Sequence, residues 1–437
     1  MPDTIYALST PSGEGGVAVI RVSGPGVTDI LRACFPNASH IEPRRVYVGK
    51  LRDGAGEVID ECLWFYMAAP RSYTREDVAE IQCHGGAVCA KRVMERVASL
   101  GARGAMPGEF TRRAFENGRI SLSQAEAVME LISARSRAAA RSALRHMETD
   151  GPMKRARAKI LDMLSHISAA DDFPEEIDEP VVRDEVISGL NEVVRLLRES
   201  ADPRSARILR EGAQVALSGS PNVGKSSLMN AILGWERAIV DPEAGTTRDV
   251  LAEKVAAQGR LFTLLDTAGQ RTEAGRVEMA GIQRAVEAEK SADVVVAVLD
   301  SSRPLTPSDH AMLARRDERY IVAENKCDLP AGRERVQGAM PISAKTGEGV
   351  EALTREILRR TEVADQENIL TSPRQIELAQ RAMSEAESAM AALEAGDPVD
   401  LAAVYLWEAA SALGEITGEE ATEKVIEGVF SNFCVGK

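Results

Sequence analysis

The sequence contains no apolar run that approaches the roughly 18 residues needed to span a membrane. It also lacks the basic and then apolar N-terminal segment that a secretory signal would require. Hydrophobic residues make up 44% of the chain and the mean hydropathy is −0.17. We therefore expect a globular cytoplasmic protein that makes no contact with membranes.

Close cysteine pairs and an excess of positive charge are also missing. The six cysteines include no C-x-x-C pair, so the sequence indicates neither a zinc site nor a disulfide framework. The net charge of −14 excludes a broad affinity for nucleic acid, because sequence-independent binding depends on Lys and Arg side chains that neutralise phosphates. Any contact with RNA must therefore be local.

A phosphate-binding loop is the most informative feature that is present. The segment Gly219-Ser-Pro-Asn-Val-Gly224-Lys225-Ser226 follows the apolar run 213–218, which predicts a strand, and a helical pattern begins at Lys225. Backbone N–H groups of such a loop bind the α- and β-phosphates of a nucleotide, the lysine reaches the β- and γ-phosphate oxygens, and the Ser226 hydroxyl would bind Mg²⁺. The loop predicts a nucleotide triphosphatase.

A second motif, Asp266-Thr-Ala-Gly269, comes directly after the apolar run 261–265. At this place a phosphate-loop enzyme needs a carboxylate near Mg²⁺ and a glycine near the γ-phosphate. Between the two motifs lies Gly245-Thr-Thr247-Arg-Asp249, in the position of a switch segment. We expect Thr247 to complete the Mg²⁺ shell with Ser226 when the γ-phosphate is present.

Two later motifs identify the base. Asn325-Lys326-Cys327-Asp328 follows the apolar run 320–324, and Ser343-Ala344-Lys345 would support the base from behind. The Asp328 carboxylate can accept hydrogen bonds from N1 and the amino group of guanine, whereas adenine presents the opposite pattern, and such a site discriminates by a factor on the order of 10⁴. The nucleotide is therefore expected to be GTP. The predicted GTP-binding residues are Asn222, Val223, Gly224, Lys225, Ser226, Ser227, Asp266, Thr267, Ala268, Gly269, Asn325, Lys326, Asp328, Ser343, Ala344 and Lys345.

The 437 residues are enough for about three domains, and we find no internal repeat. Short β-like runs and one helical pattern in residues 1–118 predict an α+β domain. Residues 119–210 and 371–437 carry apolar residues at helical spacing, and the GTPase domain at 211–370 interrupts them. We therefore predict a multidomain α/β protein in which a phosphate-loop GTPase domain is inserted into an all-α helical domain.

The loop Pro221-Asn-Val-Gly-Lys-Ser226 and the segment Gly245–Asp249 resemble the GTPase branch that contains Era, EngA and the tRNA-modifying MnmE family. This resemblance implies a K⁺ ion beside the phosphates, with Asn222, Asp241 and Glu243 as its ligands. A cation there neutralises charge that develops during hydrolysis, as an arginine finger does in other GTPases.

Across nearly its whole length the chain resembles the MnmE (TrmE) family. Era and EngA have neither the N-terminal unit nor the final segment Phe433-Cys434-Val-Gly-Lys437, so a ribosome-assembly GTPase of their type is the alternative. A third possibility is a folate-binding protein, similar to an aminomethyltransferase, whose GTPase only regulates it. The matching segments are 18–24, 72–77, 80–86, 107–115, 123–127, 172–178, 414–419 and 433–437.

The resemblance implies a homodimer whose N-terminal domains bind 5,10-methylene- or 5-formyl-tetrahydrofolate. It also implies a heterotetramer with the FAD-dependent flavoprotein MnmG (GidA). Together the two proteins would add an aminomethyl or carboxymethylaminomethyl group to C5 of the wobble uridine, U34, of certain tRNAs. The candidate folate-binding residues are Arg21, Glu80 and Arg119. The family usually has Lys-Leu-Asp-Leu where this chain has Arg119-Ile-Ser121-Leu122, so Ser121 replaces an aspartate.

Three residues are expected to be catalytic. Lys225 acts on the phosphates, and the resemblance assigns the water-orienting role to Glu278. Gln270 competes for that role because it occupies the position of the glutamine in Ras-like proteins. The resemblance implies that the tail folds back toward the folate site, where the Cys434 thiol would serve the modification chemistry.

Overall fold

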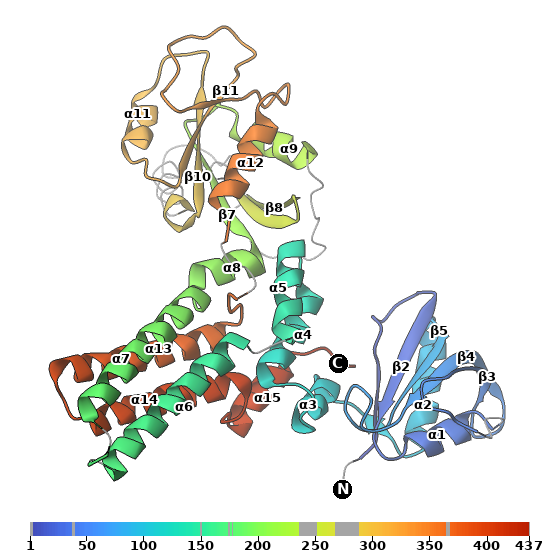
Figure 1. Ribbon diagram of the computed structural model, residues 1–437. Helices are drawn as coiled ribbons and strands as arrows, with labels where there is room; N and C mark the ends of the chain where they lie inside the picture. The colour runs from blue at the N-terminus through green and yellow to red at the C-terminus, as the bar shows by residue number, and fades with distance from the viewer. Residues whose placement is uncertain are drawn as a thin grey trace. The chain divides into compact units, whose positions relative to one another are not determined.

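The computed structural model describes residues 3–36, 40–148, 151–173, 175–176, 178–235, 251–266, 288–363 and 368–436 (Figure 1). Contacts within the chain separate two compact units. The first unit comprises Met1–Met129, His146–Val193 and Arg381–Lys437, and the second comprises Glu130–Arg145 and Val194–Gln380. Each unit contains one six-stranded sheet.

The sheet of the first unit has the strand order β3-β4-β5-β2-β1-β6. Its neighbouring strands are antiparallel, except that the short β6 runs parallel to β1. The strands are β1 (Ile5–Leu8), β2 (Val17–Ser23), β3 (Val46–Arg52), β4 (Val58–Met67), β5 (Val78–His84) and β6 (Arg103–Gly104). Two of the short β-like runs of residues 1–118, at 17–22 and 63–67, form β2 and β4, although β4 begins five residues before its run.

Two helices, α1 (Val27–Cys34) and α2 (Ala87–Ser99), bury their apolar faces in the core of this sheet. Alternation along β4 turns Cys62, Trp64 and Tyr66 inward, because successive side chains of a strand point to opposite faces. The Trp64 ring stacks between the rings of Phe35 and Tyr47, at centroid distances of 4.9 and 4.5 Å. These contacts fix the inner face of the sheet, which positions the end of β5.

Further helices that the structure describes come between and after the two sheets in sequence. They are α3 (Glu109–Glu116), α4 (Leu122–Ser133), α5 (Arg137–Glu148), α6 (Gly151–Asp172), α7 (Glu179–Ser200), α13 (Pro373–Ala395), α14 (Val399–Thr417) and α15 (Glu423–Ser431). In the first unit α14 packs along α6 (Figure 1). Among the helices that the structure describes, none has the length and apolar character needed to cross a bilayer.

The sheet of the second unit has the order β12-β11-β10-β7-β9-β8 and is parallel except for β8, which pairs antiparallel with β9. Its strands are β7 (Ala213–Ser218), β8 (Leu251–Ala257), β9 (Arg260–Asp266), β10 (Val294–Asp300), β11 (Tyr320–Asn325) and β12 (Met340–Pro341). Its helices include α8 (Pro203–Glu211), α9 (Lys225–Trp235), α11 (Pro307–Ala314) and α12 (Val350–Arg360).

Every residue of β10 and β11 is buried, as expected of central parallel strands with both faces covered. The predicted strands at 213–218, 261–265 and 320–324 and the helix that begins at Lys225 are confirmed. In such a sheet ligands bind outside the carboxyl ends of the strands. The ends of β7, β9, β10 and β11 therefore define where a nucleotide belongs, and the multidomain α/β class is confirmed.

Candidate functional site

The phosphate loop joins β7 directly to α9 (Figure 1). Gly219 and Gly224 have φ values of +148° and +99°, which side chains rarely allow. A Cβ on Gly224 would lie only 2.2 Å from Nδ2 of Asn325, so this position needs glycine for space as well as for conformation. The loop therefore keeps its backbone N–H groups close to the N-terminus of α9, where an anion is favoured.

Lys225, the first residue of α9, has a buried side chain. Its Nζ donates hydrogen bonds to the carbonyl oxygens of Gly219, at 2.6 Å, and Ser220, at 3.0 Å. The ammonium group is thus held over the loop that it must serve. Ser226 and Ser227 follow in the first turn of the helix, with exposed side chains.

Asn325 links the phosphate loop to the loop predicted to lie behind the base. Its Nδ2 donates to the carbonyl oxygen of Val223 at 2.8 Å, and its Oδ1 accepts from the N–H of Ala344 at 2.9 Å. The side chain is buried, and so is its hydrogen bond to Val223. One amide therefore fixes the distance between the two halves of the nucleotide site.

Asp300, which ends β10, holds the lysine of the base-recognition motif, a role that the sequence analysis missed. Lys326 Nζ lies 2.6 Å from Asp300 Oδ2 and 3.2 Å from the carbonyl oxygen of Asn222. Burial acts to raise the pKa of the Asp300 carboxyl, but hydrogen bonds from Lys326 and Ser302 outweigh it and leave the pKa lowered. The available signal was an aspartate that ends a strand of apolar residues.

Asp328 is exposed, so its carboxylate is accessible to a base. Ser343 Oγ donates to Asp328 Oδ1 at 2.7 Å, and this hydrogen bond is the main cause of a lowered pKa at the Asp328 carboxyl. The carboxylate is thereby ionised and oriented. Lys345, from the same loop as Ser343, also favours the ionised form.

Several predicted residues cannot be placed by this geometry. Asp266 ends β9 beside β7, but only its backbone is described. The residues that lie outside the described part of the chain are Asp241, Glu243, Thr247, Thr267, Ala268, Gly269, Gln270 and Glu278.

The three folate candidates gather in the first unit. Arg21 and Glu80 are cross-strand partners in the register of β2 and β5. Nε and Nη2 of Arg21 both donate to Glu80 Oε1, at 2.9 and 2.8 Å, and each side chain is only 16% exposed. The two residues are therefore not a solvated surface pair. Glu80 Oε2 accepts no hydrogen bond from the described residues, so it is available to a ligand donor.

An aromatic ring joins the third candidate to the first two. The Arg21 and Arg119 guanidinium carbons lie 5.6 and 5.1 Å from the centroid of the Tyr73 ring, within range of cation–π attraction. Arg119 Nη1 also donates to the carbonyl oxygen of Ser72 at 2.6 Å. Phe110, whose ring centroid is 5.8 Å from Arg21, extends the aromatic surface. Tyr73 and Phe110 lie in the matching segments 72–77 and 107–115, but the sequence analysis gave neither of them a role.

The C-terminal segment lies against these residues. Ser9 Oγ donates to the carbonyl oxygen of Gly436 at 3.2 Å, and Arg21 Nη1 makes a longer contact of 3.5 Å with the same oxygen. The N–H of Gly108 donates to the carbonyl oxygen of Cys434 at 3.4 Å. Phe433 is buried beside α3 and α4, whereas Cys434 is exposed. The expectation that the tail folds back toward the folate candidates agrees with these contacts.

Ser121 takes over the helix-capping role for which an aspartate would also serve. Its Oγ accepts from the N–H of Gln124 at 3.1 Å, and the Gln124 side chain accepts from the N–H of Ser121 at 2.9 Å. This reciprocal pair is a capping box at the start of α4. The departure at Ser121 therefore leaves the helix start intact.

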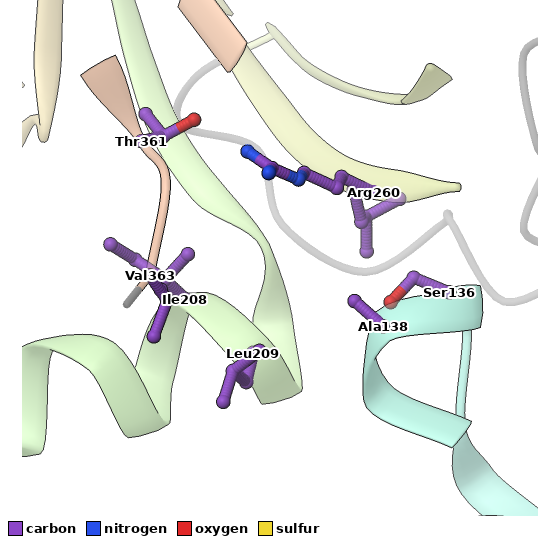
Figure 2. Close-up of a pocket in the computed structure, with 8 residues that line it drawn as sticks. Ser136, Ala138, Ile208, Leu209, Arg260, Thr361 and Val363 are labelled. Carbon is purple, nitrogen blue, oxygen red and sulfur yellow. The ribbon is translucent and has the colours of Figure 1, made fainter. Parts of the chain in front are cut away.

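A separate pocket in the second unit contains none of the predicted site residues (Figure 2). Arg260 enters it from β9, but its guanidinium group already donates to the carbonyl oxygen of Leu358 and pairs with Glu362. Its lining residues are Ser136, Ala138, Ile208, Leu209, Arg260, Leu261, Thr361 and Val363. We therefore assign it no part in nucleotide chemistry.

Two family models match the chain. The model of the TrmE N-terminus, a GTP-binding protein, matches residues 4–119, and the model of the MnmE helical domain matches residues 122–434. The tRNA modification GTPase MnmE of Chloroflexus aurantiacus is 43% identical, with 100% of each chain covered. The protein of that name from Parasynechococcus marenigrum is 44% identical, with 100% of this chain and 99% of the relative covered. Among solved structures, the G domain of the T. maritima FeoB iron transporter is 27% identical over 34% of this chain and 99% of that one, with a TM-score of 0.27.

These matches include both ends of the chain. A GTPase of the Era or EngA type would have neither the N-terminal unit nor the final segment, so the matches favour the MnmE family over that alternative. The phosphate loop, the base-recognition motif and the loop behind the base also meet at one edge of a parallel sheet. The chain belongs to the MnmE (TrmE) family and is a GTP hydrolase.

Proposed function

We propose that the protein is a K⁺-dependent GTPase that modifies tRNA together with the FAD-dependent protein MnmG. In this proposal the pair adds an aminomethyl or carboxymethylaminomethyl group to C5 of the wobble uridine, U34, of certain tRNAs. A folate supplies the one-carbon unit. The supporting observation is that Arg21 and Arg119 both lie against the Tyr73 ring, that Glu80 pairs with Arg21, and that Gly436 in the C-terminal tail contacts Arg21.

The proposed organisation follows the sequence boundaries. Residues 1–118 form a folate-binding and dimerisation domain, 119–210 and 371–437 form the two parts of a helical domain, and 211–370 form the GTPase domain. Family matches at 4–119 and 122–434 support the first boundary. We further propose a cytoplasmic homodimer that forms a heterotetramer with MnmG and acts on tRNA.

The proposed roles in the GTPase site follow from the loop chemistry. Lys225 binds the β- and γ-phosphates, Ser226 and Thr247 bind Mg²⁺, and Asp266 supports that ion through water. Lys326 and Asp328 recognise the base. Their fixed partners Asp300 and Ser343 support this assignment.

The residues around Tyr73 fit a folate. When bound, the folate supplies the one-carbon unit. The free Oε2 of Glu80 suits the N–H donors of a pterin ring, and two guanidinium groups suit the carboxylates of the glutamate tail. Burial of the pair excludes much of the competing water. The protein's contribution is therefore to orient the donor beside the Cys434 tail.

Replacing Glu80 with Gln is expected to weaken the binding of 5-formyl-tetrahydrofolate at least about tenfold, because a charged acceptor is lost and Arg21 is left without its counter-ion. Titration calorimetry on the full chain measures this. As a control, Glu61→Gln, an exposed position on β4, should bind as the wild type does. Equal affinity in Glu80→Gln and wild type would place the folate elsewhere.

K⁺ is expected to raise the GTP turnover rate while Na⁺ does not, with Asn222 as one ligand beside Asp241 and Glu243. Asn222 has a φ of +64°, and its carbonyl oxygen accepts from Lys326. The Asn222→Gly variant keeps that backbone conformation while removing the side-chain ligand, so it should lose the K⁺ effect. Turnover measured in matched KCl and NaCl tests this, and identical rates for the wild type would refute the cation assignment.

Glu278→Ala is expected to lower GTP turnover by about 10²-fold with nearly unchanged GTP affinity, as when an interaction made mainly in the transition state is lost. Gln270→Leu should have a mild effect. Single-turnover hydrolysis and equilibrium binding separate the two quantities. The opposite ranking of the variants would show that Gln270 orients the water.

A further inference from the structure

A compact group of metal-binding side chains lies at the end of the core of the first unit, apart from the Arg21 and Cys434 residues. Cys83 is on β5, Cys89 is in the first turn of α2, and Asp60 is on β4. The two sulfur atoms and a carboxylate oxygen of Asp60 all lie within 4.8 Å of one another. Two consecutive elements, β5 and α2, and the neighbouring strand β4 therefore present two thiols and a carboxylate to one point.

The group is largely shielded but has a route to solvent. Cys83 is buried, Cys89 is half-buried, and the Asp60 side chain is 12% exposed. His84, whose side chain is 77% exposed, lies at the open side, and its Nδ1 is 2.8 Å from Asp60 Oδ1. An ion could enter past this imidazole.

The charge around Asp60 is unbalanced. Its Oδ2 accepts hydrogen bonds from the backbone N–H of His84 at 2.7 Å and from the Cys89 thiol at 3.1 Å. Among the ion pairs that the structure describes, Asp60 has no Lys or Arg partner. A carboxylate and two thiols thus share a mostly buried place without a described Lys or Arg side chain to balance the carboxylate.

We propose that Asp60, Cys83 and Cys89 bind one divalent transition-metal ion, with Zn²⁺ as the best fit. Zinc bonds of about 2.3 Å to sulfur and about 2.1 Å to oxygen place tetrahedral ligand atoms about 3.5 to 3.8 Å apart. The ligand atoms, which lie within 4.8 Å of one another with Cys89 Sγ 3.1 Å from Asp60 Oδ2, need only small shifts to reach this spacing. Mg²⁺ and Ca²⁺ are excluded as the natural occupant, since they prefer oxygen ligands alone.

Binding has a defined proton balance. The two thiols lose their protons to solvent, and two thiolates, one carboxylate and one water then surround the ion. The Cys89 proton now donated to Asp60 is the one that the metal displaces. His84 acts as a positioning residue, because its imidazole Nδ1 lies 2.8 Å from Asp60 Oδ1, while the other oxygen, Oδ2, contacts the Cys89 thiol.

A titration with Co²⁺ tests the site on the full chain, after treatment with a phosphine reductant and a chelator that is then removed. Cobalt bound to thiolate gives a charge-transfer band in the near ultraviolet, whereas cobalt at the oxygen ligands of the nucleotide site does not. The band is expected to saturate at one Co²⁺ per chain and to disappear on addition of Zn²⁺. A wild-type protein without the band would overturn the proposal.

Variants assign the band to these residues. Cys89→Ser, at a half-buried position, and Asp60→Asn should each weaken Co²⁺ binding at least about tenfold. Cys34→Ala, a buried cysteine of the same core on α1, and Cys434→Ser should leave it unchanged. A band that survives in Cys89→Ser but is lost in Cys434→Ser would mean adventitious binding and would end the proposal.

Thermal unfolding shows whether a variant that fails to bind metal is still folded. Zn²⁺ should raise the Tm of the wild type and of Cys34→Ala, since a ligand that binds only the folded state stabilises it. It should not raise the Tm of Cys89→Ser, whose Tm without metal should stay near that of the wild type without metal. Equal Zn²⁺ shifts in all three proteins would contradict the site.

Discussion

Asp328→Asn is expected to reverse the nucleotide preference of the protein, from GTP to xanthosine triphosphate. In the wild type, Ser343 Oγ donates to Asp328 Oδ1 and so orients the carboxylate that is expected to accept from the base. Guanine offers N–H donors there, and an amide in place of the carboxylate presents a donor to them. Xanthine has a carbonyl oxygen instead of the amino group, so it accepts from the new amide. Because mismatched polar groups are left unpaired, the ratio of kcat/KM for the two nucleotides should change by about 10⁴-fold or more.

Steady-state hydrolysis of GTP, ATP and xanthosine triphosphate by both proteins measures the reversal. Ser343→Ala is the matched control, because it removes the hydrogen bond that orients Asp328 but keeps the carboxylate. That variant should lose rate with every nucleotide while GTP remains preferred. Equal turnover of ATP and GTP by the wild type would show that Asp328 does not select the base.

The second large effect is expected from Cys434→Ser. If the thiol belongs to the modification chemistry, this nearly isosteric change should abolish the modified wobble uridine while K⁺-stimulated GTP turnover stays almost unchanged. Cys434 is exposed next to residues that contact Arg21 and Ser9, whereas the phosphate loop belongs to the other compact unit. The two activities should therefore separate.

The measurement is nucleoside analysis of tRNA. The tRNA comes from a strain whose own gene is deleted and which is complemented with either the wild-type or the variant gene. Val435→Ala controls for disturbance of the tail, because it alters an exposed neighbour and leaves the thiol in place. Full modification in the Cys434→Ser strain would mean that the tail only packs against the N-terminal domain. Normal tRNA in the strain that lacks the protein would refute the proposed function itself.

The GTPase half of the molecule was the most predictable from sequence. The strand, loop and helix at 213–235 were predicted correctly because neighbouring residues mark each of them. An apolar run marks the strand, glycines that adopt positive φ mark the loop, and a lysine marks the helix start. The contact between Lys326 and Asp300 was not predictable in this way. Asp300 belongs to a different strand, and only the parallel register of β10 and β11 brings the two residues together.

The geometry of the N-terminal site was much less predictable from sequence. Arg21 and Glu80 were selected by resemblance, but their burial and pairing follow from the β2–β5 register, which no local pattern specifies. The grouping of Cys83, Cys89 and Asp60 could not be predicted from sequence either. Cys83 and Cys89 are six positions apart and lack the usual spacing of a metal motif, and Asp60 comes from another strand. A ligand set assembled from a sheet and a helix leaves no linear signature.

The contact between Ser9 and Gly436 also constrains how the protein is made. These residues are 427 positions apart. At a synthesis rate of about 5 to 20 residues per second, Gly436 leaves the ribosome roughly 20 to 90 s after Ser9. During that time the nascent N-terminal domain has β2 and β5 but not the segment that covers Arg21. Chains whose synthesis stops early would carry a GTPase domain with an unfinished N-terminal surface, so translation itself determines when that surface is complete.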